Sequence, residues 1–313
     1  FPVSNESVAI DLQWGNEQVT PAVNDAILQI GIATSELNKG TLADAPPVNV
    51  SLVIDKSGSM SSDNRLINAK DAAREFVKRL RPNDYISIIA FDSYVETILP
   101  SRKVGNKEAV LSAINKINIG GSTDLNSGLI AGYGEVAKAY EKNQSNKVIM
   151  LTDALTNTGV VNPSEIVQNS SLFNKEYNID ISLVGVGVDF NVDLSRQITE
   201  NASSSIHFIN DSEDIKKVFI DEVESLLCPV ARDARLIIEY DEGIELDNFF
   251  GYKPTIQDNL LELELNNMNK GLTQIFLARF TVTDPNNAIP PVTARIEYFD
   301  IAKNENSVVR GSA

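Results

Sequence analysis

The middle of the chain alternates short apolar runs with longer segments in which apolar residues recur every three or four positions. Val50–Ile54 and Val148–Leu151 are apolar at nearly every position, which is typical of strands buried on both faces. Residues 64–80 instead place their apolar side chains on one helical face, and Asp63 or Ser62 stands where a capping residue is expected. The pattern therefore predicts strands that alternate with amphipathic helices.

The same alternation continues through the next part of the chain. Further strands are predicted at Tyr85–Phe91, Val95–Leu99, Ile181–Val188 and Ser205–Ile209, and helices at residues 106–117, 125–141, 163–177, 192–201 and 212–227. Buried strands separated by amphipathic helices form a mostly parallel sheet that is covered by helices on both faces. We therefore predict a doubly wound, Rossmann-like α/β domain over residues 48–228.

The two flanks of this region have a different period. Apolar residues alternate with polar ones at residues 8–14, and the same alternation returns after Pro229, at residues 234–240, 261–265, 276–282 and 294–298. This pattern is typical of half-buried antiparallel strands. Because residues 1–47 supply too few strands for a core of their own, we predict that residues 1–47 and 229–310 form one discontinuous β-sandwich domain into which the α/β domain is inserted. Two unconnected β pieces are the alternative.

Three short polar segments follow or precede these elements. Asp55-Lys56-Ser57-Gly58-Ser59 follows the first buried strand, Gly120–Leu125 precedes a predicted helix, and Asp153 follows the strand at Val148–Leu151. In a doubly wound sheet, ligands bind at the carboxyl ends of the strands near a topological switch point. We therefore expect the three segments to meet at that edge of the sheet.

The residue types in these segments suit a hard divalent cation. The candidate metal ligands are Asp55, Ser57, Ser59, Thr123 and Asp153. Mg²⁺ is the expected ion, and Mn²⁺ and Ca²⁺ share its preference for oxygen ligands. Two carboxylates balance the charge of the ion while the hydroxyls leave it electrophilic. A carboxylate from a protein or other ligand could then complete the coordination shell. We also expect Gly58 to permit a sharp bend in the first segment.

Taken together, these segments resemble the metal-ion-dependent adhesion site (MIDAS) of von Willebrand factor A domains. The resemblance extends to the order of the elements over residues 48–227, and it implies the same five residues as metal ligands. One departure is Ala154, where many members of the family have glycine. The β-flanked arrangement is similar to bacterial surface or secreted members of the family. The resemblance thus implies a divalent-metal-dependent adhesion or binding protein at the cell surface or outside the cell.

Composition narrows the class of partner. The formal net charge of −16 disfavours nucleic acid, because an acidic surface repels phosphate backbones. The longest apolar runs are far short of the roughly 20 residues that a membrane helix needs, so we expect no membrane span in this chain. The single cysteine, Cys228, excludes an internal disulfide and fits both a surface protein and the alternative, a cytoplasmic one. The sequence leaves the oligomeric state open.

Three other functions are alternatives to adhesion. An intracellular scaffold or assembly factor acting with an AAA-type ATPase is the main alternative, because some relatives with intact metal sites work in this way. A fibre or pilus-like subunit is another. An enzyme is not expected, because metal-assisted hydrolysis needs a base near the metal and the only histidine, His207, lies far from the site segments in sequence.

Several other polar or unusual residues are interpreted as structural. Asp124 is expected to cap the helix that follows it or to support a metal ligand, Asp92 to form a turn, and His207 and Cys228 to be structural. Trp14 fits the core face of its strand, and Gly185 and Gly187 are expected to make room for a helix.

Overall fold

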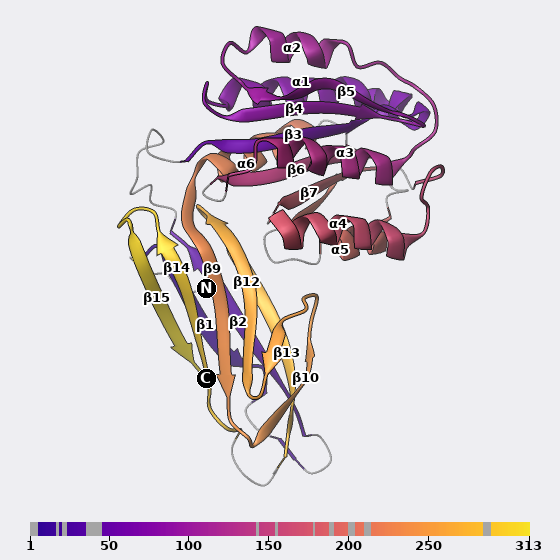
Figure 1. The fold of residues 1–313 in the computed structure, drawn as a ribbon. Helices are drawn as coiled ribbons and strands as arrows, with labels where there is room; N and C mark the ends of the chain where they lie inside the picture. The colour runs from indigo at the N-terminus through magenta and orange to yellow at the C-terminus, as the bar shows by residue number, and fades with distance from the viewer. Residues whose placement is uncertain are drawn as a thin grey trace. The chain divides into compact units, whose positions relative to one another are not determined.

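The computed structural model describes residues 6–16, 19–20, 24–35, 46–141, 144–153, 156–177, 179–187, 191–199, 204–209, 214–283 and 289–313 (Figure 1). The chain divides into two compact units. One unit contains Pro46–Thr199 and Ser204–Leu227, and the other contains the described residues before Pro46 and after Leu227. Each unit has its own hydrophobic core, so each is described by itself.

The first unit is built on a six-stranded sheet in the order β5-β4-β3-β6-β7-β8. Its strands are β3 (Val48–Asp55), β4 (Tyr85–Phe91), β5 (Val95–Lys103), β6 (Ser145–Thr152), β7 (Asp180–Val186) and β8 (Ser205–Ile209). All neighbouring pairs are parallel except β4 and β5, where β5 returns antiparallel along the edge. Every described residue of β3 is buried, which explains its nearly continuous apolar sequence.

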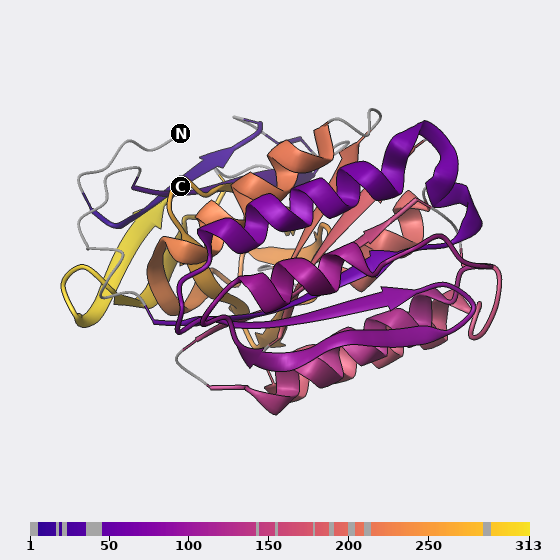
Figure 2. The ribbon, with the colours of Figure 1, turned by 90° about the horizontal axis from the view of Figure 1, so that it is seen from above.

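Helices cover both faces of this sheet. They are α1 (Arg65–Arg79), α2 (Glu108–Asn115), α3 (Leu125–Lys138), α4 (Pro163–Tyr177), α5 (Val192–Ile198) and α6 (Ile215–Leu227), and a 3₁₀ segment, η1 (Gly58–Asn64), precedes α1. Residues of α1, α2 and α6 share one core, and residues of α3, α4 and α5 share the other. Figure 2 shows α1 and α6 side by side, and Phe76 and Phe219 join them edge to face at 6.2 Å between ring centroids. The predicted doubly wound α/β fold is confirmed.

The start of α1 differs from the sequence expectation. Its N-cap is Asn64, which makes no side-chain capping hydrogen bond, so the prediction of a cap by Asp63 or Ser62 is wrong. Asp63 and Asn64 both adopt left-handed backbone conformations, with φ of 49° and 56°. Short polar residues tolerate this conformation better than others, and here they turn the chain sharply from η1 into α1. Because both residues turn the chain, the helix begins at Arg65.

The second unit consists of two antiparallel sheets. The first sheet has the order β1-β2-β13-β10 and consists of β1 (Val8–Trp14), β2 (Asp25–Thr34), β10 (Ile244–Phe249) and β13 (Thr273–Val282). The second sheet has the order β11-β12-β9-β14-β15 and consists of β9 (Pro229–Tyr240), β11 (Thr255–Gln257), β12 (Leu260–Asn269), β14 (Val292–Asp300) and β15 (Glu305–Ser312). Alternating residues of both sheets form a single core. Strands from before and after the α/β unit therefore share one sandwich, as predicted, and the alternative of two unconnected β pieces is wrong.

One aromatic contact joins the two sheets of the sandwich, and a second lies within one of the sheets. Phe280 of β13 lies between Trp14 of β1, at 5.8 Å between centroids, and Tyr240 of β9, at 5.2 Å. Both pairs are close to perpendicular, an arrangement that aromatic rings favour. The expectation that Trp14 faces the core is confirmed, because its indole packs against the core of the sandwich. The sequence pattern did not reveal β10, β11 or β15, in which many residues are exposed.

Candidate metal centre

The order of strands creates a switch point at the centre of the α/β sheet. β4 lies on one side of β3 and β6 lies on the other. Asp55 is the last residue of β3, and Asp153 directly follows the last residue of β6. Crevices for ligands form at the carboxyl ends of strands that diverge in this way. Both carboxylates therefore start from the edge of the sheet where a ligand is expected.

Direct contacts connect four of the five candidate ligands. The backbone N–H of Ser57 donates to Oδ1 of Asp55 at 2.8 Å, and the hydroxyls of Ser57 and Ser59 lie 3.1 Å apart. The Ser59 hydroxyl also donates to Oδ1 of Asp153 at 2.8 Å. Asp55 in turn accepts a hydrogen bond of 2.6 Å from the hydroxyl of Thr152. The first and third segments of the sequence prediction therefore meet side chain to side chain.

The segment that contains Thr123 is joined to the same edge through its backbone. The N–H of Gly58 donates to the carbonyl of Gly121 at 2.8 Å, which ties the first loop to the second. The N–H of Thr123 donates to the side chain of Asn157 at 2.8 Å, and Thr123 is buried. Gly58 is not among the described glycines with positive φ, so its backbone conformation is open to other residues. Ala154 lies outside the described residues.

Asp55 is a buried acid whose hydrogen-bond donors are neutral. Burial raises its pKa from 3.8 to about 6, and the nearby charge of Asp153 also raises it, although the bonds from Thr152 and Ser57 act in the opposite direction. A cation next to Asp55 would offset the cost of its buried charge. Two carboxylates with two serine hydroxyls and a threonine form a donor set of hard oxygens, so these residues fit a divalent ion of the Mg²⁺ type.

Arg65 is a neighbour of the site that the sequence patterns did not single out. Its Nη1 donates to Oδ2 of Asp153 at 2.6 Å, and Nη2 lies 3.5 Å from Asp63. The Asp153 side chain is fully buried, while Arg65 keeps 18% of its side chain exposed. Arg65 is the first residue of α1, and the only signal available in the sequence was its place directly after the acidic and polar loop.

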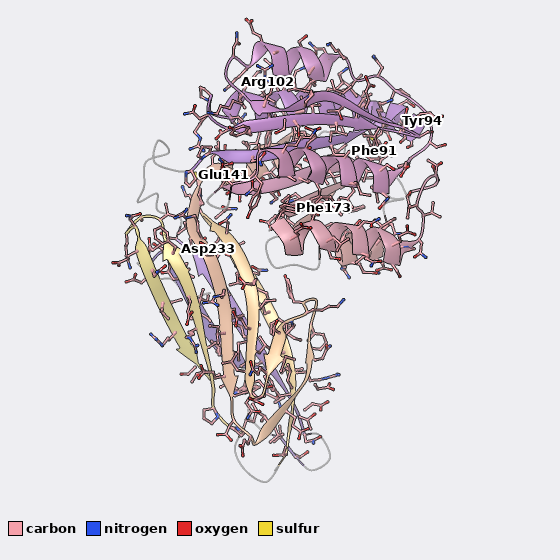
Figure 3. The ribbon with its side chains drawn as sticks, in the orientation of Figure 1. Phe91, Tyr94, Arg102, Glu141, Phe173 and Asp233 are labelled. Carbon is pink, nitrogen blue, oxygen red and sulfur yellow. The ribbon has the colours of Figure 1, made fainter. Side chains whose placement is uncertain are left out.

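Asp92 contributes more than the turn that the sequence predicted. The turn is present, because Oδ1 of Asp92 accepts a hydrogen bond from the N–H of Tyr94 at 2.9 Å. Its Oδ2 also binds Nζ of Lys56 at 2.8 Å and the N–H of Gly121 at 3.0 Å. Although burial acts in the opposite direction, these bonds hold the pKa of Asp92 below its usual range. Asp92 thus ties the first and second loops of the site to β4, whose last residue Phe91 and the neighbouring Tyr94 are labelled in Figure 3.

Two other sequence interpretations are also resolved by the described contacts. Asp124 is the N-cap of α3 and accepts hydrogen bonds from the N–H of Ser127 at 3.0 Å and from its hydroxyl at 2.8 Å, so the predicted cap is confirmed. Nε2 of His207 lies 2.7 Å from a carboxylate oxygen of the buried Glu222 on α6, which fits the structural role expected of it.

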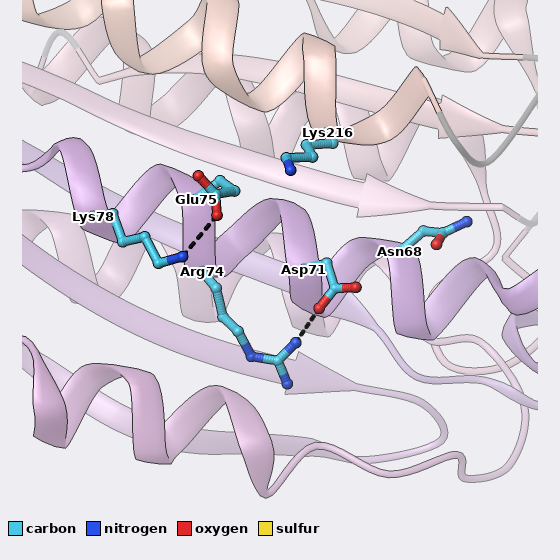
Figure 4. A pocket seen from close by; sticks show the side chains of 6 residues that line it. All are labelled: Asn68, Asp71, Arg74, Glu75, Lys78 and Lys216. Carbon is cyan, nitrogen blue, oxygen red and sulfur yellow. Dashed lines mark hydrogen bonds and ion pairs between the residues drawn. The ribbon is translucent and has the colours of Figure 1, made fainter.

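A surface cleft lies along α1 and α6, and none of the candidate metal ligands lines it (Figure 4). It is lined by Asn68, Asp71, Arg74, Glu75, Lys78 and Lys216. Arg74 is paired with Asp71, and Lys78 with Glu75, each within one helix. Such exposed pairs are typical of a solvated helix face.

The family of the α/β unit follows from its sequence. Residues 50–155 match the profile of the von Willebrand factor type A domain, a match that includes most of β3, all of β4 and β6, and the three loops of the candidate site. The chain carries a von Willebrand factor type A domain. This family is known for metal-dependent adhesion and protein binding.

Three similar proteins place this domain in context. The Escherichia coli (strain K12) protein YfbK is 29% identical over 199 residues, which cover 63% of this chain but only 34% of that relative. A von Willebrand factor type A structure from Catenulispora acidiphila matches with a TM-score of 0.75 at 14% identity, covering 99% of this chain and 74% of that chain. Proximal thread matrix protein 1 from the mussel byssus, solved with a zinc-occupied MIDAS motif, has a TM-score of 0.52 at 19% identity and covers 60% of this chain and 49% of that chain. At these identities the structures establish the shared fold.

Within the described part of the chain, every helix is too short or too polar to span a bilayer.

Proposed function

We propose that this von Willebrand factor A domain binds a partner through one divalent metal ion held by Asp55, Ser57, Ser59, Thr123 and Asp153. The observation that supports this most directly is the buried Asp55, whose pKa is raised to about 6 by burial beside a second carboxylate. A buried acid that receives only neutral hydrogen bonds lacks a compensating charge, and a bound cation supplies one. The hydroxyls of Ser57 and Ser59 lie next to it as further hard donors.

The partner in this proposal is a protein or other ligand that presents a carboxylate. When bound, the metal supplies a Lewis acid whose formal charge the two carboxylates balance, while the neutral hydroxyls leave it electrophilic. The chain's own residues then have two tasks. Asp55 and Asp153 provide the negative charge, and the neutral hydroxyls of Ser57 and Ser59 orient the site without adding to that charge. A site of this composition favours an anionic ligand over a neutral one.

Mg²⁺ is the proposed ion, because the donors are all hard oxygens and none is a thiol or imidazole. Mn²⁺ is the natural substitute in a binding assay. The zinc in the MIDAS of the mussel thread protein shows that a related fold also takes a third divalent metal. We propose a location outside the cell or at its surface, in line with the name of that neighbour, a thread matrix protein of the mussel byssus.

The proposal is for binding and not for catalysis. Hydrolysis at a metal requires a base or nucleophile within reach of the ion. The single histidine of the chain is engaged with Glu222, and Lys56, the basic residue inside the first loop, is engaged with Asp92. These two candidate bases, His207 and Lys56, thus have structural partners.

The decisive experiment is calorimetric titration of the whole chain with Mg²⁺ and Mn²⁺. We expect the wild type to bind one ion and Asp55→Ala to lose binding, with the circular dichroism spectrum retained. Asp71→Ala is the matched control, because it removes one carboxylate from the exposed side of α1 and should bind metal as the wild type does. Equal metal affinity in Asp55→Ala and wild type would rule out the proposed site.

A further inference from the structure

Of the two candidate carboxylates, Asp153 already forms an ion pair with a side chain of the protein, Arg65. Nη1 of Arg65 donates to Oδ2 of Asp153 at 2.6 Å, while the other oxygen of Asp153 accepts the Ser59 hydroxyl at 2.8 Å. The two carboxylates of the site are therefore not equivalent. Asp55 is hydrogen-bonded by neutral groups, whereas Asp153 has a full positive charge at hydrogen-bond distance.

The position of Arg65 is specified by the fold on two sides. Gly187, just after β7, has a φ of +91°, and a Cβ built there would lie 2.9 Å from Nη2 of Arg65. The glycine that the sequence suggested as room for a helix thus makes room for this guanidinium. On the other side, the left-handed residues Asp63 and Asn64 turn the chain so that α1 begins with Arg65 at the edge of the site. Such backbone conformations persist only where the surrounding structure holds them.

We propose that Arg65 is the resident counter-cation of Asp153 and sets the metal affinity of the site. The inference rests on the proposed function. Because Arg65 neutralises one of the two carboxylates, a divalent ion meets a site with one net negative charge among these three groups. Arg65 and the ion also repel each other. The ion is therefore held more weakly than by the same five ligands alone, and the loaded site keeps a positive charge that an acidic partner can balance.

The test is a Mn²⁺ titration of the whole chain, wild type against Arg65→Gln, at low and equal ionic strength. We expect Arg65→Gln to bind Mn²⁺ about tenfold more tightly, since a neighbouring positive charge has been removed. In chelator the same variant should unfold at a lower temperature than the wild type, because Asp153 loses its partner. A loss of structure alone does not produce tighter binding, so the gain in affinity separates the two effects.

Two further variants control for a general change of charge and for the loss of the charge at Arg65. Arg74→Gln removes one positive charge from the same helix away from the site, where Arg74 is paired with Asp71, and should leave Mn²⁺ affinity unchanged. Arg65→Lys retains the charge and should bind Mn²⁺ close to the wild-type affinity. If Arg65→Gln binds Mn²⁺ no more tightly than the wild type, or if Arg65→Lys gains as much as Arg65→Gln, the inference is wrong. If the wild type binds no Mn²⁺ at all, the proposed function itself has failed.

Discussion

Two buried carboxylates of the α/β unit, Asp55 and Glu222, are compensated in opposite ways. Asp55, at the end of β3, receives hydrogen bonds from the backbone of Ser57 and the hydroxyl of Thr152, and burial raises its pKa to about 6. Burial also disfavours the charged form of Glu222, on α6. However, Lys147 lies 3.1 Å away and His207 2.7 Å away, and they hold its pKa well below the usual range.

The contrast separates a structural acid from an acid available for binding. Glu222 carries its counter-charges within the fold and connects α6 to strands of the sheet through Lys147 and Ser182. Asp55 is surrounded by neutral donors, so its charge remains costly until a cation arrives from outside. A fold tolerates such a cost where it supports binding. Burial of an acid therefore indicates a binding site only when, as for Asp55, the fold supplies no counter-charge.

The largest expected effect is on stability when Glu222 is removed. Glu222→Ala leaves Lys147 buried without its partner, and we expect the free energy of unfolding to fall by roughly 3–5 kcal/mol. Chemical denaturation of the whole chain measures this change in the free energy of unfolding of the α/β unit. Glu224→Ala is the control on the same helix, since that side chain is 65% exposed and should change stability little. A loss below about 1 kcal/mol for Glu222→Ala would show that the cluster is not a structural ion pair.

Asp55 should behave in the opposite way. In chelator, Asp55→Asn removes a costly buried charge and should leave stability unchanged or raise it. Saturating Mn²⁺ should stabilise the wild type by about 2.7 kcal/mol at a hundred times the dissociation constant, and should not stabilise Asp55→Asn. Thermal unfolding with and without metal checks both statements. A large loss of stability for Asp55→Asn in chelator would make Asp55 a structural acid like Glu222.

The dependence on pH distinguishes the two acids further. The pKa of Asp55 is about 6 in the folded chain and 3.8 as the reference value. Its contribution to stability without metal is present below about pH 4 and is lost as pH rises through 6, by up to roughly 3 kcal/mol. Glu222 has a lowered pKa, so its contribution is present above about pH 4.5 and is lost as pH falls below that value.

Between pH 4.5 and 7 the pH dependence of the two acids can therefore be separated. The difference in stability between Asp55→Asn and wild type in chelator should grow as pH rises through 6. Metal binding should respond in the reverse direction, because a proton on Asp55 competes with the ion, and Mn²⁺ affinity should weaken as pH falls below 6. Flat profiles for both measurements would mean that Asp55 titrates far from pH 6.

The contrast between these acids also shows how far the sequence could predict this molecule. Short apolar runs and helical periodicity predicted the α/β fold, because strands buried on both faces of a sheet, such as β3 and β6, need apolar residues at nearly every position. The start of α1 was predicted to within one residue, but its cap was not, since nothing in the sequence signals two consecutive left-handed residues at Asp63 and Asn64. The exposed strand β15 has too few apolar residues to stand out.

For the site, the pattern of Asp and Ser residues identified the segments that meet, but not the groups that tune them. Arg65 and Asp92 reach the loops through tertiary contacts from α1 and from the end of β4, and neither carries a local motif. Lys147 and Glu222 are 75 residues apart in the chain and pair only because α6 packs on the sheet. Counter-charges come from any part of a fold, so a sequence motif for the ligands does not predict them.

The smallest expected effect concerns Gly120, whose backbone packs against Asp92, the acid that ties the first and second loops together. A Cβ built on Gly120 would lie 1.7 Å from Oδ2 of Asp92, the atom that also binds Lys56 and Gly121. Gly120→Ala must therefore displace either the loop or Asp92. We expect a loss of roughly 1–2 kcal/mol in stability and a several-fold weaker Mn²⁺ affinity.

Gly134→Ala is the matched control for this last variant. Gly134 lies within α3, where an added Cβ meets no atom within 4 Å, so alanine should stabilise the helix by roughly 0.5–1 kcal/mol and leave Mn²⁺ affinity unchanged. Calorimetric titration and thermal unfolding of both variants measure these effects. If Gly120→Ala loses stability but keeps wild-type Mn²⁺ affinity, Asp92 supports the fold and not the loops of the site. If Gly120→Ala loses both stability and Mn²⁺ affinity, then Asp92, which is paired with Lys56, holds in place the loops around Asp55, which has only neutral hydrogen-bond donors.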